Sequence, residues 1–416
     1  MSYKELKSLS YGDTELYIRE YLSRFDSDEA IKLDFYIGKN QAFFLQNSDV
    51  MTVAYKIAKL DKKIDNLCNS LPGVALNQYS KKCLIDEIVI TNKIEGIHSS
   101  RKEIGEALDI LESQSKAKGK QKRFLSLVNK YFKLIKAKPI SLQNSQDIRN
   151  IYDEILLDEV IIEDSSNKPD GQIFRKDSVS VYSETDKIIH SGLSPENKII
   201  EAMEQALKFL NDDSVEDLFR ICIFHYLLEY IHPFYDGNGR LGRFLFSYGI
   251  SQTLCPLISF RISETIKENI KSYYKAFKTC NDQRNLGDLT PFLLMQLNMI
   301  LDAMGELNTS LEQRYATWNK YEEAVDNYCG NNRNLRRLFS YLIQASLFSE
   351  KGISMHELQQ NMKISKYIIT NLMKEIPTEL LVIKKKSNFK YYSINLDELN
   401  SIIVAQSIEL IKTEKL

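Results

Sequence analysis

The sequence is poor in the residues that interrupt helices. Its 416 residues include only 16 glycines and 8 prolines, about half the usual share of these two residue types. Turn-rich β architectures need more of both. The composition therefore favours long helices, and a mostly α fold is the first expectation. At roughly 100 to 200 residues per domain, the length allows two or three domains.

Signals for disulfides, zinc and membranes are also lacking. The six cysteines are widely spaced, without a CxxC pair or a histidine at ligand spacing, which argues against a disulfide framework and a zinc site. No run approaches the roughly 18 apolar residues that cross a bilayer, and the N-terminus has no apolar signal-peptide core. We therefore expect reduced thiols, a cytoplasmic protein and no membrane partner.

Charge of one sign does not dominate the whole chain. Lys and Arg number 55 against 56 Asp and Glu, so no global attraction to nucleic acid is implied. Residues 331–416 differ, because they hold 13 Lys and Arg against 8 Asp and Glu. An anionic partner would have to meet a local patch in this C-terminal part.

Helical periodicity dominates what is present. From about Asp28 to Leu111 apolar residues recur at helical spacing, which predicts a helical N-terminal region over residues 1–111. Within it, a helix of about residues 80–96 ends at Gly96, a residue type suited to the left-handed position after a helix. Ser100 and Glu103 predict a capping box for the next helix.

The middle of the chain contains one departure from this pattern. Between Glu159 and Gly192 the helical period disappears, and GQIFRKDSVSVY alternates apolar and polar residues, which predicts a short β-hairpin. The segment from Ser214 to Ile231 has almost no polar face and is expected inside the domain. His225 on this segment is interpreted as a core histidine with satisfied hydrogen bonds.

A dense group of chemically useful residues follows the buried segment, in IHPFYDGNGRLGRFLFSYGI. Gly237 to Gly239 allow backbone N–H groups to converge on one anion. The apolar run from Leu241 predicts a helix whose N-terminus favours phosphate. Arg240 and Arg243, three residues apart, offer two guanidiniums to a polyphosphate.

Two other side chains of this loop suit a metal and a proton. Asp236 is an oxygen ligand of the kind that Mg²⁺ takes beside phosphates. His232 is able to accept a proton near neutral pH, and Phe234 is interpreted as an apolar anchor for the loop. Together these residues predict activation of a nucleophile beside a bound nucleotide.

The pattern HxFxDGNGRxxR resembles the motif of the Fic (Fido) family of nucleotidyltransferases, and the likeness covers about Ser80 to Ile300. Every fixed position is present: His232, Phe234, Asp236, Gly237, Asn238, Gly239, Arg240 and Arg243. The resemblance implies a helical Fic fold with a short β-hairpin flap, its catalytic core over residues 112–328. It also implies transfer of AMP from ATP to a Ser, Thr or Tyr hydroxyl of a target protein.

The resemblance assigns a role to each residue. His232 would remove the proton of the target hydroxyl, and Asp236 would hold Mg²⁺ on the α- and β-phosphates. The nucleotide-binding residues would be Gly237, Asn238, Gly239, Arg240, Leu241, Gly242, Arg243, Val181, Tyr274 and Asn281. The related Doc kinases carry Lys where this chain has Gly239, which argues against transfer of the γ-phosphoryl group.

Two further segments resemble parts of the family outside its main motif. Thr91-x-x-x-Glu95-Gly96 resembles the inhibitory motif of Fic proteins, which implies that Glu95 contacts Arg243 and keeps the enzyme off. Residues 173–182 resemble the flap, whose edge would hold the target segment near His232. An ordinary helix end and a surface hairpin are the alternatives.

The C-terminal part has its own pattern. From Arg333 it predicts three helices and a hairpin with Ser387 and Asn388 at its tip, an order that resembles a winged helix over residues 333–416. DNA phosphates would meet lysines of the third helix and the wing, and base edges would meet Tyr367 or Asn371; the lysines are Lys363, Lys366, Lys374, Lys384, Lys385, Lys386 and Lys390. Contacts with another protein or a homodimer are the alternative use.

Two other functions are left open beside AMP transfer. In one, the protein removes AMP from its target, and Glu95 orients a water molecule. In the other, the chain is a DNA-binding regulator whose Fic core senses a nucleotide.

Overall fold

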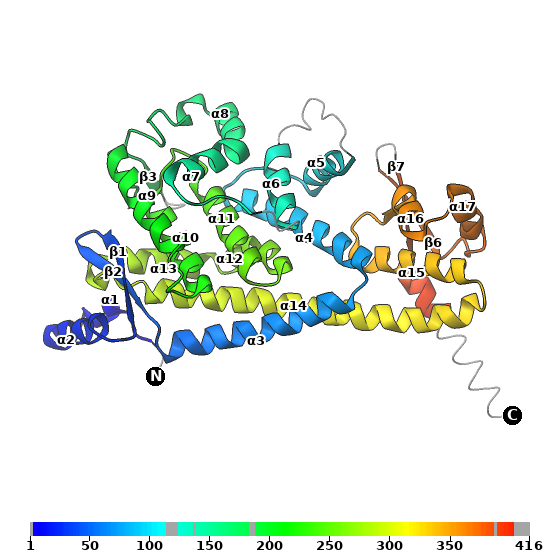
Figure 1. The fold of residues 1–416 in the computed structure, drawn as a ribbon, viewed down its shortest axis with the longest axis horizontal. Coiled ribbons are helices and arrows are strands. Elements are labelled where there is room, and N and C mark those ends of the chain that lie inside the picture. The colour runs from blue at the N-terminus through cyan, green and yellow to red at the C-terminus, as the bar shows by residue number, and fades with distance from the viewer. Residues whose placement is uncertain (1–2, 114–123, 136–138, 183–187, 387–388, 403–416) are drawn as a thin grey trace. The chain divides into compact units, whose positions relative to one another are not determined.

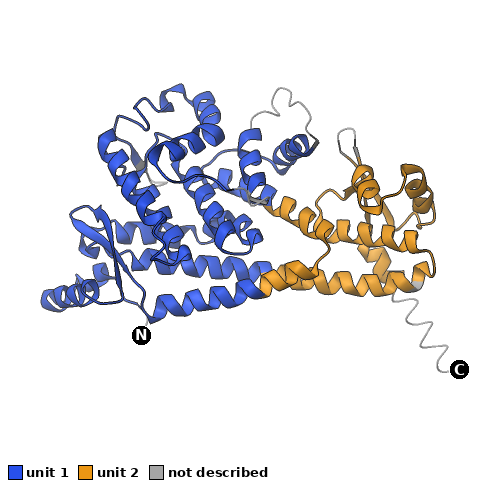
Figure 2. Cartoon of the chain, in the orientation of Figure 1, with its two compact units in different colours: residues 1–62, 84–307 blue, residues 63–83, 308–416 orange. Residues whose placement is uncertain are grey.

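The computed structural model describes residues 3–113, 124–135, 139–182, 188–386 and 389–402. It is mostly helical, as the composition predicts (Figure 1). The chain forms two compact units, residues 1–62 with 84–307 and residues 63–83 with 308–416 (Figure 2). The three-part division expected from the sequence stays a prediction.

The first unit contains most of the helices and two of the sheets. Three helices, α3 (Ser48–Ser70), α4 (Gly73–Ile94) and α14 (Thr290–Cys329), contribute residues to both units. The remaining helices of the first unit are α1 (Leu6–Leu9), α2 (Thr14–Phe25), α5 (Arg101–Ser113), α6 (Leu125–Ile135), α7 (Ser145–Tyr152), α8 (Asp158–Glu163), α9 (Glu196–Leu210), α10 (Asp217–Ile231), α11 (Asn238–Thr253), α12 (Ile262–Glu268) and α13 (Ile270–Cys280). Short 3₁₀ turns lie at Ser165–Asn167, Pro256–Phe260 and Gln283–Asn285.

A β-hairpin near the N-terminus corrects the expectation of helix from about Asp28 onward. Strands β1 (Ala30–Ile37) and β2 (Asn40–Leu45) pair antiparallel. Leu33, Phe35 and Ile37 are buried and the residues between them are exposed. Such alternation of buried and exposed residues is typical of a strand with one buried face. The longer helical pattern that follows in the sequence hid this strand signal.

The pair α10 and α11 forms the centre of the first unit. Nearly every residue of α10 is buried, which confirms the expected interior helix. His225 on α10 is fully buried with both ring nitrogens bonded, Nδ1 to the Gly242 carbonyl at 3.2 Å and Nε2 to the Tyr273 hydroxyl at 2.7 Å. The interpretation of His225 as a satisfied core histidine is confirmed.

The flap hairpin is present but displaced along the chain. Its strands are β3 (Ser180–Tyr182) and β4 (Ile188–Ser191), so only the end of the expected range 173–182 is a strand. The preceding backbone is held differently, because the Glu196 carboxylate accepts the N–H groups of Gln172, Ile173 and Phe174. Side chains thus take the place of a strand partner there.

The second unit has its own hydrophobic core and a three-stranded sheet. Its elements after α14 are α15 (Arg333–Phe348), β5 (Ile353–Ser354), α16 (Met355–Met362), α17 (Lys366–Lys374), β6 (Leu381–Lys386) and β7 (Phe389–Ile394), with strand order β5-β7-β6. The three helices and the hairpin lie where the sequence predicts them. That they form a winged helix stays a prediction.

Helix ends follow the chemistry predicted for them. Gly96 has φ +74° just beyond α4, and Ser100 and Glu103 exchange the hydrogen bonds of a capping box before α5. No helix in the described part of the chain is long and apolar enough to cross a membrane.

Candidate active site

The motif loop joins α10 to α11 through two left-handed residues. His232 ends α10 with φ 52° and ψ 63°, an uncommon conformation for a residue other than glycine. Gly237 has φ 83° directly before Asn238, the first residue of α11. The loop therefore places His232 beside the N-terminus of a 16-residue helix, where the helix dipole favours an anion.

Aromatic packing and one amide fix the loop in place. Phe234 is completely buried and stacks on Tyr152 with ring centroids 3.7 Å apart, which confirms its role as an apolar anchor. The Asn238 side chain accepts from the Phe234 N–H at 2.9 Å and donates to its carbonyl at 2.8 Å. The amide of Asn238 is thus committed to the loop, and only its backbone is left to meet a phosphate.

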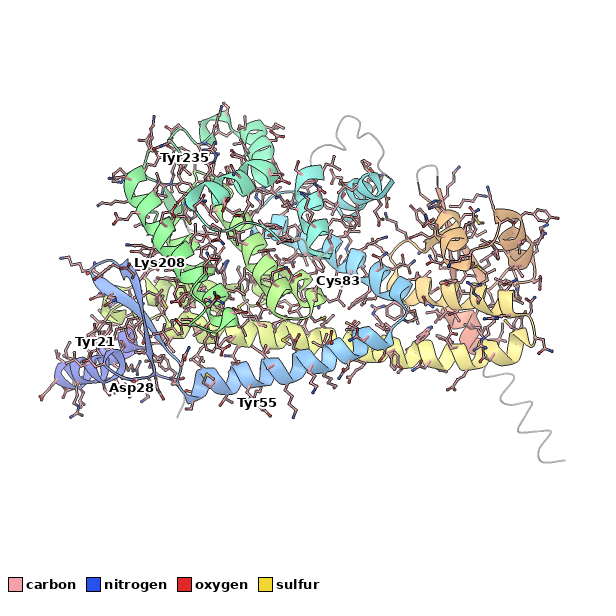
Figure 3. The ribbon with its side chains drawn as sticks, in the orientation of Figure 1. Tyr21, Asp28, Tyr55, Cys83, Lys208 and Tyr235 are labelled. Atoms are coloured by element: carbon pink, nitrogen blue, oxygen red, sulfur yellow. The ribbon has the colours of Figure 1, made fainter. Side chains whose placement is uncertain are left out.

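Arg175 supports the loop from the flap side, and sequence reasoning missed it. Its guanidinium is buried and donates to the His232 carbonyl from Nε at 3.0 Å and from Nη2 at 2.8 Å, and to the Leu193 carbonyl at 2.9 Å. On the rim, Tyr235 (labelled in Figure 3) donates to Asp170 and accepts from the Asp177 N–H. A single arginine in a loop carries no sequence signal, although it lies inside the segment identified as the flap.

A short π-helix at Asp153–Leu157 connects α7 to α8 beside the loop. Such helices are rare and often lie near functional sites. This one places Tyr152 under Phe234 and brings Glu159 to Arg240, with 2.9 Å between Oε2 and Nη1. Arg240 is almost fully buried, and its Nη2 lies 3.8 Å from Asp236. Glu159 is a second residue that the sequence did not reveal.

Arg243 is held by the end of α4. Its Nη2 donates to the Glu95 carboxylate at 2.7 Å and to the Thr91 carbonyl at 3.2 Å, and its Nε donates to the Thr91 hydroxyl at 2.8 Å. The Arg243 side chain is 3% exposed and that of Glu95 is 35% exposed. Burial works to lower the pKa of Arg243, but the interactions with Glu95, Tyr273 and Glu229 together outweigh it and the pKa is raised. The contact implied for Glu95 is present, and Thr91 shares it.

Two glycines of the motif leave room for carboxylates. A Cβ on Gly239 would lie 2.3 Å from Oε1 of Glu95, and a Cβ on Gly242 would lie 2.2 Å from Oε1 of Glu229. Either methyl group would displace the carboxylate beside it. Glycine at these two positions therefore lets the Glu95 and Glu229 side chains lie directly against α11. This packing role is separate from any contact of the glycine backbone with a ligand.

Burial dominates the titration of His232 and of Glu229 one turn before it. Burial lowers the pKa of His232 to about 4, helped by His190 and Arg175, while the Glu229 carbonyl and the Glu95 charge oppose this. Burial raises the pKa of Glu229 to about 7, helped by Glu95 and opposed by Arg243. His232 is therefore neutral at pH 7, as a proton acceptor must be.

Asp236 is the residue that suits Mg²⁺. Its carboxylate is partly exposed and accepts from the Gly237 N–H at 2.6 Å, which leaves oxygen lone pairs directed to solvent. In the described ranges no three His, Cys, Asp or Glu side chains cluster as a metal site. A single carboxylate is enough for Mg²⁺ that binds together with substrate phosphates, because phosphate oxygens and water molecules supply the other ligands.

For four of the predicted nucleotide-binding residues, the contacts in the structure are with the protein itself or with solvent. Leu241 is fully buried in the core, and Asn281 at the end of α13 accepts from the Tyr226 hydroxyl at 2.6 Å. Tyr274 is 43% exposed, and its ring packs edge-on against Tyr273. Val181 pairs through its backbone with His190 in the flap. Their contact with a nucleotide stays a prediction.

Comparison with known proteins agrees with this geometry. The Fic/DOC family model matches residues 142–249. The chain is similar to "Protein adenylyltransferase fic-1" of Caenorhabditis elegans, 33% identical over 104 residues (24% of this chain, 18% of the relative), and of Caenorhabditis briggsae, 32% identical over 98 residues (23% and 18%). The match thus spans about a fifth of the length of these curated relatives.

A solved structure is similar over most of the chain. It is a Fic family protein from Desulfovibrio desulfuricans G20, with a TM-score of 0.50 and 18% sequence identity, covering 84% of this chain and 96% of the other. At this identity the likeness concerns the fold. The family match, together with the loop from His232 to Arg243, identifies residues 142–249 as a domain of the Fic/DOC family.

Proposed function

We propose that this protein is an adenylyltransferase that moves AMP from ATP to a hydroxyl side chain of a target protein, with Mg²⁺ and with Glu95 as its inhibitor. The observation that carries the proposal is the loop between α10 and α11. It places a neutral His232 beside a left-handed Gly237 at a helix N-terminus. A base next to an anion site is what attack of a hydroxyl on a phosphate requires.

The phosphates would lie on the N-terminal turn of α11. The backbone of Gly237 to Gly239 would meet the α- and β-phosphates, and Asp236 would hold the metal against them. Arg243 would pair with the γ-phosphate once Glu95 has moved away. His232 would then take the proton of the target hydroxyl, whose oxygen bonds to the α-phosphorus as pyrophosphate leaves.

The target segment would add to the flap. Strands β3 and β4 form a two-stranded sheet, and an extended segment can extend such a sheet through backbone hydrogen bonds, without demanding one target sequence. The flap is anchored to the site, because Nε2 of His190 on β4 bonds the Tyr230 carbonyl at 2.6 Å, two residues before His232. A hydroxyl on the added strand would thus be presented near the base.

The names of the matched relatives support adenylyl transfer in particular. Both are named protein adenylyltransferases, and their match includes about a quarter of this chain. A DNA-binding regulator would not need the neutral histidine, whereas a transferase does.

The experiment uses the full chain carrying Glu95→Gly, incubated with Mg²⁺ and ATP labelled at either the α- or the γ-phosphate. Label from the α-phosphate in the chain itself, or in lysate proteins, supports adenylylation. Label from the γ-phosphate would indicate a kinase. The double variant Glu95→Gly/His232→Ala is the matched control and should bind ATP within a few-fold while transferring nothing.

A further inference from the structure

Glu229 is the strongest chemical feature of the site that the motif does not include. It lies on the last turn of α10, three residues before His232, and its Oε2 is 3.9 Å from Nδ1 of His232. Its side chain is 14% exposed. A carboxylate is costly to bury in such a place unless it serves a partner.

Both groups contain an atom that lacks a hydrogen-bond partner. Among the described residues, Nδ1 of His232 and Oε1 of Glu229 are buried without a bond of normal hydrogen-bond geometry, although the Glu229 carbonyl lies near enough to the His232 ring to raise its pKa. Buried polar atoms are rarely left unsatisfied, and exceptions often mark a group that finds its partner in another state. A movement of either side chain by about 1 Å would bring Nδ1 of His232 and Oε2 of Glu229, now 3.9 Å apart, to hydrogen-bond distance.

The surroundings of Glu229 keep this carboxylate in place. Gly242 on α11 leaves room for Oε1 of Glu229, because a Cβ atom on residue 242 would lie only 2.2 Å from that oxygen. The charged and titratable groups that act on the pair come from every side: Arg243 on α11, Glu95 at the end of α4, Tyr273 on α13, Arg175 before the flap and His190 on β4. Arg243 and Glu95 act on Glu229 with opposite signs.

We propose that Glu229 is the positioning residue of His232, and that its carboxylate accepts the Nδ1–H of His232 when the target hydroxyl is deprotonated. This inference rests on the proposed transfer reaction. With its hydrogen on Nδ1, His232 presents a lone pair at Nε2, which takes the hydroxyl proton. The resulting imidazolium is stabilised by Glu229, which gains no proton itself.

The pair also explains how a deeply buried histidine is a useful base. In the resting chain the pKa of His232 is near 4, which makes it a weak acceptor at pH 7. An ionised Glu229 would strengthen it. Glu95 opposes that ionisation by raising the pKa of Glu229. Departure of Glu95 therefore frees Arg243 and favours the charged form of Glu229 in one step.

The test measures self-modification by the full chain with α-labelled ATP in the Glu95→Gly background, from pH 5.5 to 8.5. Adding Glu229→Gln should lower kcat at least about tenfold, leave the ATP Kd within about threefold, and remove the decline in rate toward low pH that protonation of Glu229 causes. Glu264→Gln is the control, since Glu264 pairs with Arg261 at 2.6 Å on α12 and takes no part in the site. An unchanged pH profile in Glu95→Gly/Glu229→Gln, or a loss confined to ATP affinity, would overturn the inference.

A second measurement needs no turnover. Nitrogen-15 NMR of histidine-labelled protein reports which ring nitrogen of His232 carries the proton, with His232→Ala identifying its signals. Glu229→Ala, which removes the acceptor, should shift His232 away from the Nδ1–H form, whereas Glu264→Ala should not. If this shift occurs while no variant transfers AMP, the proposed function fails and the pairing stands. If His232 keeps the same form in both variants, the pairing itself is wrong.

Discussion

At the residue scale, Arg243 has two competing sets of partners. In the structure its donors go to Thr91 and Glu95, whereas the proposed reaction assigns it to a phosphate. A guanidinium binds carboxylate and phosphate with the same fork of N–H groups. Under the proposed function, occupancy of Arg243 by Glu95 would therefore exclude productive binding of ATP.

Replacing Glu95 should activate the enzyme. Glu95→Gly removes both the partner of Arg243 and a charge that repels phosphate, and we expect self-modification to rise at least about tenfold, equivalent to about 1.4 kcal/mol in the barrier. Label transfer from α-labelled ATP is the measurement. Lys93→Gly, an exposed position in the same last turn of α4, is the control for the effect of glycine on the helix.

Two outcomes would count against autoinhibition by Glu95. One is an unchanged rate in Glu95→Gly; the other is a lower rate, as expected if Glu95 orients water for removal of AMP. Arg243→Ala should not mimic the activation, because it frees Glu95 but also removes the proposed phosphate partner.

Two buried groups should give pH dependences of opposite sign. Burial lowers the pKa of His225 to about 3 from its usual 6.5, and burial raises the pKa of Glu87 to about 7 from 4.5. Below pH 6.5 the unfolded state protonates its histidine first, so wild type should lose stability relative to His225→Gln as the pH falls. Above pH 4.5 the unfolded state ionises its glutamate first, so wild type should lose stability relative to Glu87→Gln as the pH rises toward 7.

Urea denaturation between pH 4.5 and 7.5 measures both differences in the free energy of unfolding. Each pKa unit corresponds to about 1.4 kcal/mol, so changes of a few kcal/mol are expected. Parallel curves for wild type and His225→Gln would show that His225 does not stay neutral in the fold. The same result for Glu87→Gln would show that Glu87 is ionised.

At the element scale, the flap and the motif loop depend on one another. Arg175 spans them with bonds to the carbonyls of His232 and Leu193. His232 has φ 52°, and such a conformation persists only where its surroundings hold it. The segment before β3 therefore positions His232, the proposed base, as well as leading into the hairpin.

Replacing Arg175 by Lys should uncouple the two elements. A single ammonium cannot reproduce the paired bonds to the His232 carbonyl. In the Glu95→Gly background we expect Arg175→Lys to reduce transfer about tenfold or more, with ATP affinity within about threefold. Isothermal titration and label transfer measure the two quantities, and Lys176→Gln at the exposed neighbouring position is the control. A loss of ATP binding equal to the loss of rate would place Arg175 in the nucleotide site instead.

The helices and the motif loop could be predicted because their signals are local. Periodicity, caps and glycines lie within a few residues, and the interior helix, Gly96 and the Ser100 cap were found this way. Glu159 and Arg175 could not be found, because their partners Arg240 and His232 are distant in sequence. Glu229 lies only three residues before His232, but the sequence does not show that the two side chains approach each other in a buried site. The β1–β2 hairpin was missed although its alternation is local, since the helical pattern that follows it set the period assigned to the whole region.

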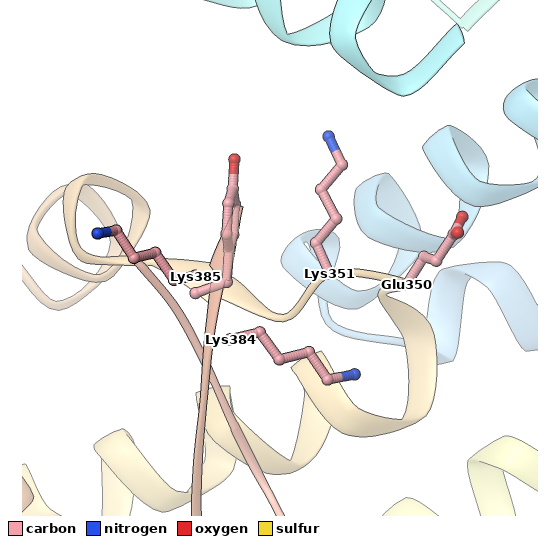
Figure 4. A pocket seen from close by; sticks show the side chains of 5 residues that line it. Glu350, Lys351, Lys384 and Lys385 are labelled. Atoms are coloured by element: carbon pink, nitrogen blue, oxygen red, sulfur yellow. The ribbon is translucent and has the colours of Figure 1, made fainter. Parts of the chain in front are cut away.

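At the scale of the whole molecule, the second unit carries the lysines for which contact with DNA is predicted. Tyr367, on the first turn of α17, is 75% exposed. Lys384 and Lys385 on β6, with Lys351, Tyr391 and the acidic Glu350, line a pocket of about 400 Å³ (Figure 4). Binding of DNA by this unit stays a prediction, because exposed lysines also occur on hairpin edges that contact proteins or remain solvated.

Replacing Lys384 and Lys385 by Gln should lower DNA affinity and its salt dependence. Each lost phosphate contact removes about 0.9 from the slope of log affinity against log salt, so a fall of roughly 2 is expected. Fluorescence anisotropy over a salt series is the measurement. Lys56→Gln/Lys59→Gln, with the same charge change on exposed positions of α3, is the control. If wild type binds no duplex in a salt-dependent way, contact with a protein becomes the use of this surface.

Helix α4 belongs to both units, and this has a consequence for the proposed inhibition by Glu95. Its first turns, where Val74 packs on the C-terminal core and Tyr79 bonds Ser310 at 3.1 Å, lie in the second unit, and its last turn holds Arg243 in the first (Figure 2). Short isolated helices are marginal in water. Unfolding or removing the second unit should therefore weaken the helix end that carries Thr91 and Glu95. Basal self-modification then becomes a measure of the integrity of the C-terminal unit, and a chain truncated after Leu307 is expected to be more active than the intact protein.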